Sequence, residues 1–312
     1  MRPPPPRGPL SAQVLRIIVE GSGGARSAQS FARTVRAVAD PMADGDLHLA
    51  LACCYELHYR GFDEVAATDA LEWDPVLIGL RTLLEARFEQ AVRMAVPPSA
   101  PSLLGLPVAE ALQAVVDGDD GPPLSRFLLR EATLEQFRDF VVQRSVYHLK
   151  EADPHTWQLP RLSGRAKESL AEIQADEYGG GRSGRSHAAL FGRVMTALGL
   201  DATYGRYWDQ ALPETLASVN LMSLLGLHRR PRGAAIGHLA ALEMTSTVPN
   251  GRYGNGVHEQ IAATDLCGSF VLDEPARRKD VLWGARANLA LDARASAALL
   301  TTWRARSDQG AA

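Results

Sequence analysis

Two carboxylates and a histidine lie close together in the sequence, in a region of helical character. They are Glu151, Glu177 and His187, and Tyr178 with three glycines follows the second glutamate. Carboxylate oxygens and imidazole nitrogens are the ligands with which helical bundles hold non-haem iron or manganese. Acidic side chains on helices, however, usually face solvent, and a single histidine is more often an ordinary polar residue. The spacing alone therefore gives a candidate metal site.

The hydrophobic pattern of the elements that must position these residues is helical along most of the chain. Apolar residues recur at spacings of three and four, and the alternation typical of strands is nearly absent. We therefore predict an all-α fold with a single helical domain. Helices are predicted at about residues 27–40, 46–59, 75–96, 107–116, 124–131, 133–151, 163–177, 187–198, 213–226, 231–245, 257–268 and 275–304.

The two ends of the chain differ from this helical domain. Residues 1–25 contain four consecutive prolines and a glycine-rich stretch, and only a short apolar patch from Val14 to Val19 could form a brief helix. We predict a mobile N-terminal segment over residues 1–25. The helical domain is predicted over residues 26–305, followed by a tail over 306–312.

The composition is that of a soluble globular protein. The chain has 312 residues, of which 46% are hydrophobic, and a formal net charge of −3. This charge gives no reason to expect nucleic acid or a membrane as partner. No stretch approaches the roughly 18 apolar residues of a transmembrane helix, and the three cysteines lack a zinc-binding spacing. We therefore expect a cytoplasmic protein.

A longer pattern connects the three candidate ligands. Glu151 is followed by Ala-Asp-Pro-His-Thr-Trp, Glu177 by Tyr-Gly-Gly-Gly, and His187 by Ala-Ala-Leu-Phe. This pattern resembles the haem-oxygenase-like di-iron oxidase superfamily, in particular its actinobacterial branch of iron-containing redox enzymes. The resemblance extends from about Leu47 to Trp303, and it implies a bundle of about seven helices with haem-oxygenase topology.

The resemblance also implies a set of metal ligands. The first carboxylate falls on Glu151, the second on Glu177 and the first imidazole on His187. Three further ligands are implied on a late helix, in the pattern His-x-x-x-Asp-x-x-His, and His258 matches its last histidine. The positions expected for its companions hold Gly251 and Asn255. The first histidine and the aspartate of the pattern therefore have no counterpart in this chain.

Other residues do not replace the missing ligands clearly. Asp265 shares a helix face with His258 if the helix is continuous, but it is not an obvious replacement. His238 and Glu243 lie on the preceding helix, where Glu243 is a credible buried acid. Glu56 and His58 have the wrong spacing for one helix face, so we predict structural roles for them. The predicted ligands are thus Glu151, Glu177, His187 and His258, which could hold one Fe(II) with two carboxylates and two imidazoles, or two ions as in the family.

The resemblance implies a non-haem iron-dependent redox enzyme. It would use Fe(II), with dioxygen as co-substrate, to oxidise a small organic molecule, and no catalytic residue or electron donor is assigned. Loss of part of the late ligand helix favours an alternative, a non-catalytic and metal-poor descendant that acts as a binding or interaction protein. A haem-binding protein is a weaker alternative. A homodimer is one possible state of the protein.

Overall fold

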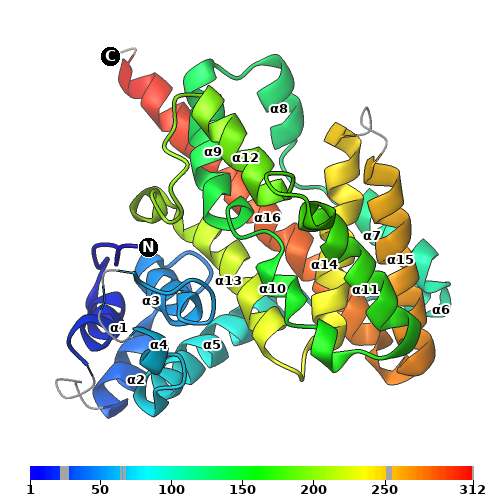
Figure 1. The fold of residues 1–312 in the computed structure, drawn as a ribbon, viewed down its shortest axis with the longest axis horizontal. Coiled ribbons are helices and arrows are strands. Elements are labelled where there is room, and N and C mark those ends of the chain that lie inside the picture. Colours follow the sequence, from blue (N-terminus) through cyan, green and yellow to red (C-terminus); the bar gives the residue numbers. More distant parts are fainter. Residues whose placement is uncertain (22–27, 64, 66–67, 251–254, 311–312) are drawn as a thin grey trace.

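The described part of the chain is helical throughout. The computed structural model describes residues 1–21, 28–63, 65, 68–250 and 255–310, apart from the side chains of 246–250, 255–259 and 307–310. Within these ranges there are α-helices, short 3-10 turns and loops, and no strand (Figure 1). The predicted all-α class is therefore confirmed.

The helices follow one another with short connections, and several of them are only one or two turns long. The bounds are α1 Pro9–Glu20, α2 Ala28–Ala37, α3 Gly45–Glu56, α4 Thr68–Leu71, α5 Pro75–Ala95, α6 Pro101–Gly105, α7 Val108–Asp117, α8 Leu124–Arg130, α9 Leu134–His148 and α10 Asp153–Thr156. The chain continues with α11 Gly164–Glu177, α12 His187–Ala197, α13 Pro213–Leu227, α14 Arg232–Asn250, α15 Asn255–Asp273 and α16 Arg278–Gly310. Short 3-10 turns lie at Leu159–Arg161, Gly179–Gly181, Trp208–Gln210 and Pro275–Arg277.

Local sequence signals explain where several of these helices begin. The side chain of Asp74 accepts hydrogen bonds from the amides of Val76 and Leu77, and Pro75 occupies the first position of α5. Thr133 and Gln136 form a capping box at the start of α9. These side chains satisfy amide groups that have no partner within the first helical turn.

The long helices α14 and α16 lie together in the middle of the molecule (Figure 1). Helix α15 packs against α14 and α11, and α13 joins this part of the bundle to α3. The contact between α14 and α16 is close because glycines face backbone on both helices. A Cβ atom at Gly237 would overlap the carbonyl oxygen of Val281, and one at Gly284 would overlap that of Ala234.

The N-terminal segment contains a longer helix than the brief one predicted over Val14 to Val19. Residues 9–20 form α1, in which Leu10, Val14, Ile17 and Ile18 are at most 1% exposed. The carboxylate of Asp46 accepts hydrogen bonds from the amides of Leu10 and Ser11, and thereby caps α1 from the neighbouring helix α3. The prolines obscure this helix in the sequence, but Pro9 at its first position is compatible with a helix start.

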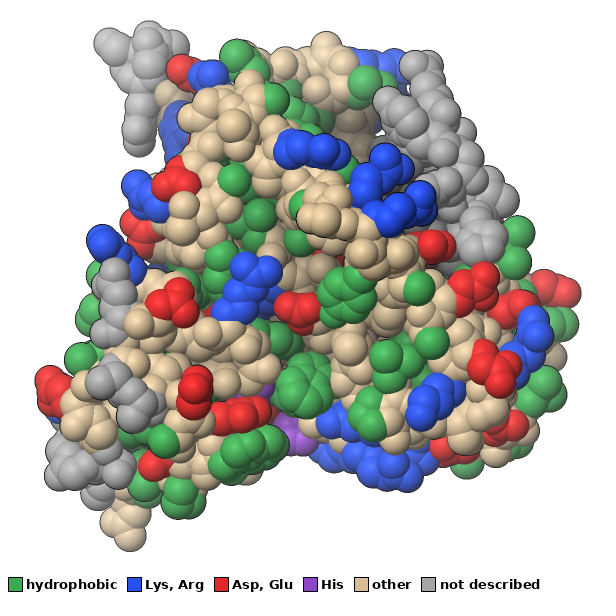
Figure 2. All heavy atoms as spheres, in the orientation of Figure 1, with side chains coloured by type: hydrophobic (Ala, Val, Ile, Leu, Met, Phe, Trp, Pro, Cys, Tyr) green, Lys and Arg blue, Asp and Glu red, His purple; other side chains and the backbone are tan. Residues whose placement is uncertain are grey.

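Helix α16 continues to Gly310, past residue 306, where the tail is predicted to begin. Lys/Arg and Asp/Glu side chains are interspersed over the face seen in Figure 2. No described helix is both long and apolar enough to cross a membrane.

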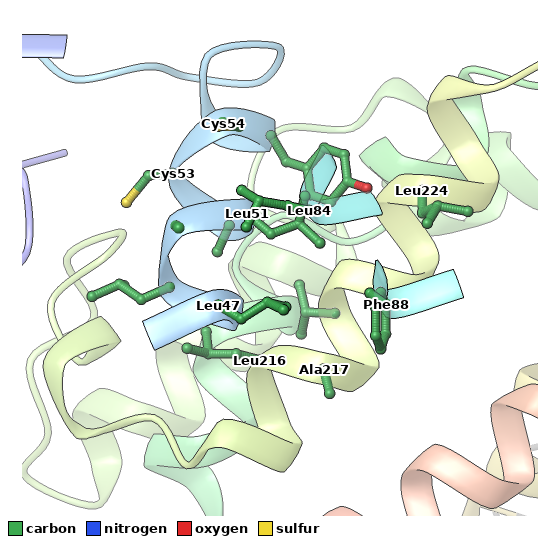
Figure 3. Packing of buried hydrophobic residues seen from close by; sticks show 14 of the residues in the cluster. Leu47, Leu51, Cys53, Cys54, Leu84, Phe88, Leu216, Ala217 and Leu224 are labelled. Atoms are coloured by element: carbon green, nitrogen blue, oxygen red, sulfur yellow. The ribbon is translucent and has the colours of Figure 1, made fainter. Parts of the chain in front are cut away.

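The main core lies where α3, α5 and α13 meet. Leu47 and Leu51 from α3, Leu84 and Phe88 from α5, and Leu216 from α13 are all fully buried (Figure 3). All three cysteines are buried and free of disulfides. This core fixes the first helices of the chain against the half of the bundle that carries the candidate ligands.

Candidate metal centre

The structure brings three of the four predicted ligands together. One potential ligand atom from each of Glu151, Glu177 and His187 lies within 4.8 Å of the others. Ligand atoms that share one metal ion at about 2.0–2.2 Å are at most about 4.4 Å apart. Only a small closure of these side chains is therefore needed to bind one ion. Among the described residues, no other group of three histidine, cysteine or acidic side chains meets this condition.

Three helix ends position the three side chains. Helix α9 ends at His148, and Glu151 lies in the turn between α9 and α10. Glu177 is the last residue of α11, and His187 is the first residue of α12. The hydroxyl of Ser186 accepts a hydrogen bond from the amide of Ala189 at 3.3 Å, which fixes the start of α12 beside His187.

Glycines reverse the chain between Glu177 and His187. Gly179, Gly180 and Gly181 all have positive φ angles, between 60° and 71°. This left-handed conformation is strained for residues with a Cβ atom, whereas glycine adopts it readily. The glycine run therefore lets α12 return toward the end of α11, so that His187 meets Glu177.

Each carboxylate of the centre is paired with a histidine. Nδ1 of His187 lies 2.9 Å from Oε2 of Glu177, and Nδ1 of His148 lies 2.9 Å from Oε2 of Glu151. Side-chain exposure is 6% for Glu177 and 13% for Glu151, so both carboxylates are largely removed from water. His148 was not identified from the sequence, although its position three residues before Glu151 at a helix end was a usable signal.

The electrostatic surroundings keep Glu151 ionised. Burial by itself raises the pKa of this carboxyl, but the interactions with His148 and His187 outweigh it and hold the pKa below its usual value. A carboxylate that stays ionised although it is largely buried is a suitable ligand for a cation.

His258 lies on α15, but its side chain is outside the described part of the structure. Asn255 is the first residue of α15, and Gly251 lies outside the described residues. Asp265 pairs with Arg165 at the surface, at 2.8 Å, rather than facing the three converging ligands.

His238 and Glu243 have surroundings that differ from those of the three converging ligands. His238 is buried against His155, with Nδ1 of His238 and Nε2 of His155 3.3 Å apart. Burial is the main cause that lowers the pKa of His155 to about 4, so that this histidine is neutral at pH 7. Glu243 is also buried, and it contributes to the electrostatic environment of Tyr147.

Glu56 and His58 have partners outside the centre. Oε2 of Glu56 accepts a hydrogen bond from the hydroxyl of Tyr204 and lies 3.7 Å from Nζ of the buried Lys150. Nδ1 of His58 lies 3.2 Å from Oε1 of Glu72. These contacts agree with the structural roles predicted for both residues.

A cleft of about 520 Å³ is lined by Asp153 and Tyr178, which lie within two residues of Glu151 and Glu177 in the chain. Its lining includes Tyr59, Trp157 and Tyr178, and the charged residues Arg60 and Asp153. The hydroxyl of Tyr178, the residue after Glu177, donates a hydrogen bond to Oδ1 of Asp153 at 2.8 Å. A larger hollow of about 780 Å³ lies against the N-terminal segment. None of the three converging ligands lines either hollow, but only the cleft is lined by residues within two positions of Glu151 and Glu177. The cleft is therefore the better candidate for a ligand that reacts at the centre.

The helical fold and the carboxylate–imidazole centre define the class of protein: an all-α protein with a candidate metal site. Comparison with protein families gives a more specific assignment. Residues 138–257 match the model of the iron-containing redox enzyme family. This segment includes Glu151, Glu177 and His187, and the predicted family resemblance is thereby confirmed. No curated protein matches the chain. The family match supports an iron-dependent redox function.

Proposed function

We propose that this protein is a non-haem iron enzyme that uses dioxygen to oxidise a small organic molecule. The observation that carries this proposal is the convergence of Glu151, Glu177 and His187 within 4.8 Å. The family match over residues 138–257 favours iron over other divalent metals.

The chemistry of the three side chains fits an iron ion. Oxygen and imidazole ligands suit Fe(II), and a centre with few protein ligands keeps positions open for small molecules. Two carboxylates held close together repel each other, and a bound cation removes this repulsion. When bound, iron would supply the one-electron chemistry with dioxygen that amino-acid side chains lack.

The residues of the centre then have distinct roles. Glu151, Glu177 and His187 would hold the ion, and His258 is proposed as a fourth ligand. His148 would orient Glu151 through the 2.9 Å contact between the imidazole and the carboxylate. One or two iron ions are compatible with this proposal.

The cleft beside the centre is proposed to bind the organic substrate. Its volume of about 520 Å³ lies within the range of about 300–1,000 Å³ that is usual for small-molecule sites. Aromatic side chains and two opposite charges in its lining would orient a small molecule that carries polar groups. Tyr178 and Asp153 connect this lining to the chain segments that carry Glu177 and Glu151.

Anaerobic titration with Fe(II), followed by metal analysis, tests the proposal. We expect one or two iron ions per chain, consumption of dioxygen by the iron(II)-loaded protein, and no Soret band after haem addition. The Glu151→Gln variant should bind no iron. Absence of iron from the folded wild-type protein would contradict the proposal and favour a non-catalytic binding protein.

A further inference from the structure

Glu151 and Glu177 lie on segments that pack against different parts of the bundle. Glu151 lies in the turn before α10, which packs mainly against α13, whereas Glu177 ends α11, which packs mainly against α15. A Cβ atom at Gly226 of α13 would overlap the carbonyl oxygen of Pro154 in α10, so these two helices are in close contact. The spacing of the two carboxylates therefore depends on the contacts that join α10 to the end of α11.

Tyr178 and Asp153 form a direct link between these two segments. The hydroxyl of Tyr178 donates a hydrogen bond to Oδ1 of Asp153 at 2.8 Å. Tyr178 directly follows Glu177 in the chain, and it is separated from this ligand by a single peptide bond. Asp153 lies two residues after Glu151. One hydrogen bond between side chains thus joins the immediate neighbours of both carboxylate ligands.

The backbone holds both partners of this link close to the ligands. The amide of Tyr178 donates a hydrogen bond to the carbonyl oxygen of Gln174 at 3.0 Å, which keeps Tyr178 on the last turn of α11. The amide of Asp153 donates to the carbonyl oxygen of Lys150 at 2.9 Å, which keeps Asp153 on the turn that carries Glu151. A change in the distance between the side chains of Tyr178 and Asp153 would therefore move the two ligand-bearing segments relative to each other.

Thr156 of α10 adds a second connection to α11. Its hydroxyl donates a hydrogen bond to Oε1 of Gln174 at 2.6 Å and lies 2.9 Å from the hydroxyl oxygen of Tyr178. Asp153, Thr156 and Tyr178 all line the cleft. A molecule bound in the cleft would therefore lie against the side chains that join α10 to α11.

We propose that Tyr178 is a positioning residue, which sets the spacing between Glu151 and Glu177 through its hydrogen bond to Asp153. This role rests on the proposed function, because the spacing matters only if the two carboxylates bind an ion. Their potential ligand atoms lie within 4.8 Å of each other, and one ion requires a separation of at most about 4.4 Å. The hydrogen bond thus holds the two segments near the separation that a bound ion needs.

Removal of one hydroxyl tests the proposal in the full chain. Tyr178→Phe should weaken Fe(II) binding by about 10-fold, the lower end of the usual cost of losing a group that orients a metal ligand. The matched control is Tyr207→Phe, because the hydroxyl of Tyr207 accepts a hydrogen bond from the amide of Asp201 at 2.9 Å, in the connection between α12 and α13. This control should leave the affinity unchanged. Competitive titration with a chelator gives the affinities, and circular dichroism checks that both variants are folded.

Substitutions of Asp153 distinguish the hydrogen bond from the negative charge. Asp153→Ala removes the acceptor and should weaken Fe(II) binding as much as Tyr178→Phe does. Asp153→Asn keeps an acceptor oxygen without the charge and should retain the wild-type affinity. Because both residues act through one contact, the double variant Tyr178→Phe/Asp153→Ala should lose about 10-fold in affinity rather than about 100-fold. Equal losses for Asp153→Asn and Asp153→Ala would assign the effect to charge and overturn the positioning role.

Bound Co(II) reports the geometry of the centre without any need for activity. Its visible absorption depends on the number and arrangement of the ligands, so Tyr178→Phe should shift the absorption bands and Tyr207→Phe should not. Unchanged Fe(II) affinity and an unchanged Co(II) spectrum in a folded Tyr178→Phe variant would overturn the positioning role and leave the proposed function in place. A wild-type protein that binds neither ion would overturn the proposed function, and the role of Tyr178 with it.

Discussion

Two pairs of buried glutamates in this protein are neutralised in different ways. Glu85 and Glu89 lie one turn apart on α5, with 5% and 8% exposure, and their partners include Arg81, Arg93 and Arg230. Glu151 and Glu177 are paired with histidines instead. Arginine is always charged in proteins, whereas histidine is charged only when protonated.

The difference between arginine and histidine partners indicates which pair of glutamates is suited to bind a cation. Glu85 and Glu89 on α5 already have permanently charged arginine partners and form a structural ion-pair network with them. Burial by itself raises the pKa of Glu89, but hydrogen bonds from Arg230 and Arg93 outweigh it and lower the pKa. Glu151 and Glu177 have no permanently charged partner among their histidines, and the imidazole nitrogen of His187 is a further potential ligand. A metal ion can therefore complete the second pair but not the first.

Removing one carboxylate from each pair should give the largest contrast. Glu177→Gln should abolish iron binding, because it removes one of three converging ligands. Glu89→Gln should leave the iron content unchanged and lower the stability of the fold. Metal analysis of both purified variants measures the first effect and urea denaturation the second. Equal iron content in the two variants would remove the distinction between the pairs.

The histidine partners can be compared in the same way. His148 contacts Glu151, and His228 contacts Glu85 with Nε2 3.0 Å from the carboxylate. His148→Ala should weaken iron binding by about 10–100-fold, the usual cost of losing a residue that orients a metal ligand. His228→Ala is the matched control and should leave the iron affinity unchanged. Competitive titration with a chelator gives both affinities.

Acidification should affect the two regions at different pH. Burial lowers the pKa of His155, near the centre, from 6.5 to about 4. The unfolded chain therefore takes up a proton between these values that the folded chain does not, and stability falls as the pH falls. The expected loss is about 2 kcal/mol between pH 6.5 and 5. Because the pKa of Glu89 is lowered, the stability that its ion pairs contribute is lost only below its unfolded pKa of about 4.5.

Urea denaturation at several pH values measures this loss, with the His155→Gln variant as comparison. The variant should show a shallower decrease of stability between pH 6.5 and 5 than the wild-type protein. Parallel curves for the two proteins would mean that His155 takes up its proton in the folded state as well.

The smallest effect is expected from loss of one arginine. Arg230 donates a hydrogen bond to Oε1 of Glu89 at 2.7 Å, but its side chain is 54% exposed and Arg93 also contacts Glu89. Arg230→Met should therefore lower the free energy of unfolding by only about 1 kcal/mol, since solvent screens the pair. Arg206→Met removes a more exposed ion pair with Asp201 and should change stability less. Thermal denaturation compares the two variants.

The sequence predicted the helical class and the candidate centre for different reasons. Helix periodicity is a local property, so the positions of α5, α9 and α13 follow from the chain itself. The centre depended on a longer pattern around Glu151 and Glu177, because spacing alone does not distinguish ligands from solvent-exposed acids.

The features that were missed depend on contacts between distant or ambiguous segments. Arg230 and Glu89 are 141 positions apart, so nothing local indicates that they pair. Helix α1 is stabilised by Asp46 from another helix, and its prolines suggested a mobile segment instead. His148 lies three residues before Glu151 at a helix end, and this spacing is compatible both with an ordinary helix end and with the contact to Glu151 that the structure shows.

An ion bound where the three helix ends converge would act as a crosslink within the chain. An ion that joins Glu151 to His187 would close the segment between them into a ring, much as a disulfide does. This ring contains α10, α11 and the exposed residues Arg182 and Arg185, where trypsin can cut. In the metal-bound protein, a cut in this loop would leave both ends held together at the ion. The centre would thus act as a removable crosslink, and proteolysis would have different consequences before and after metal loss.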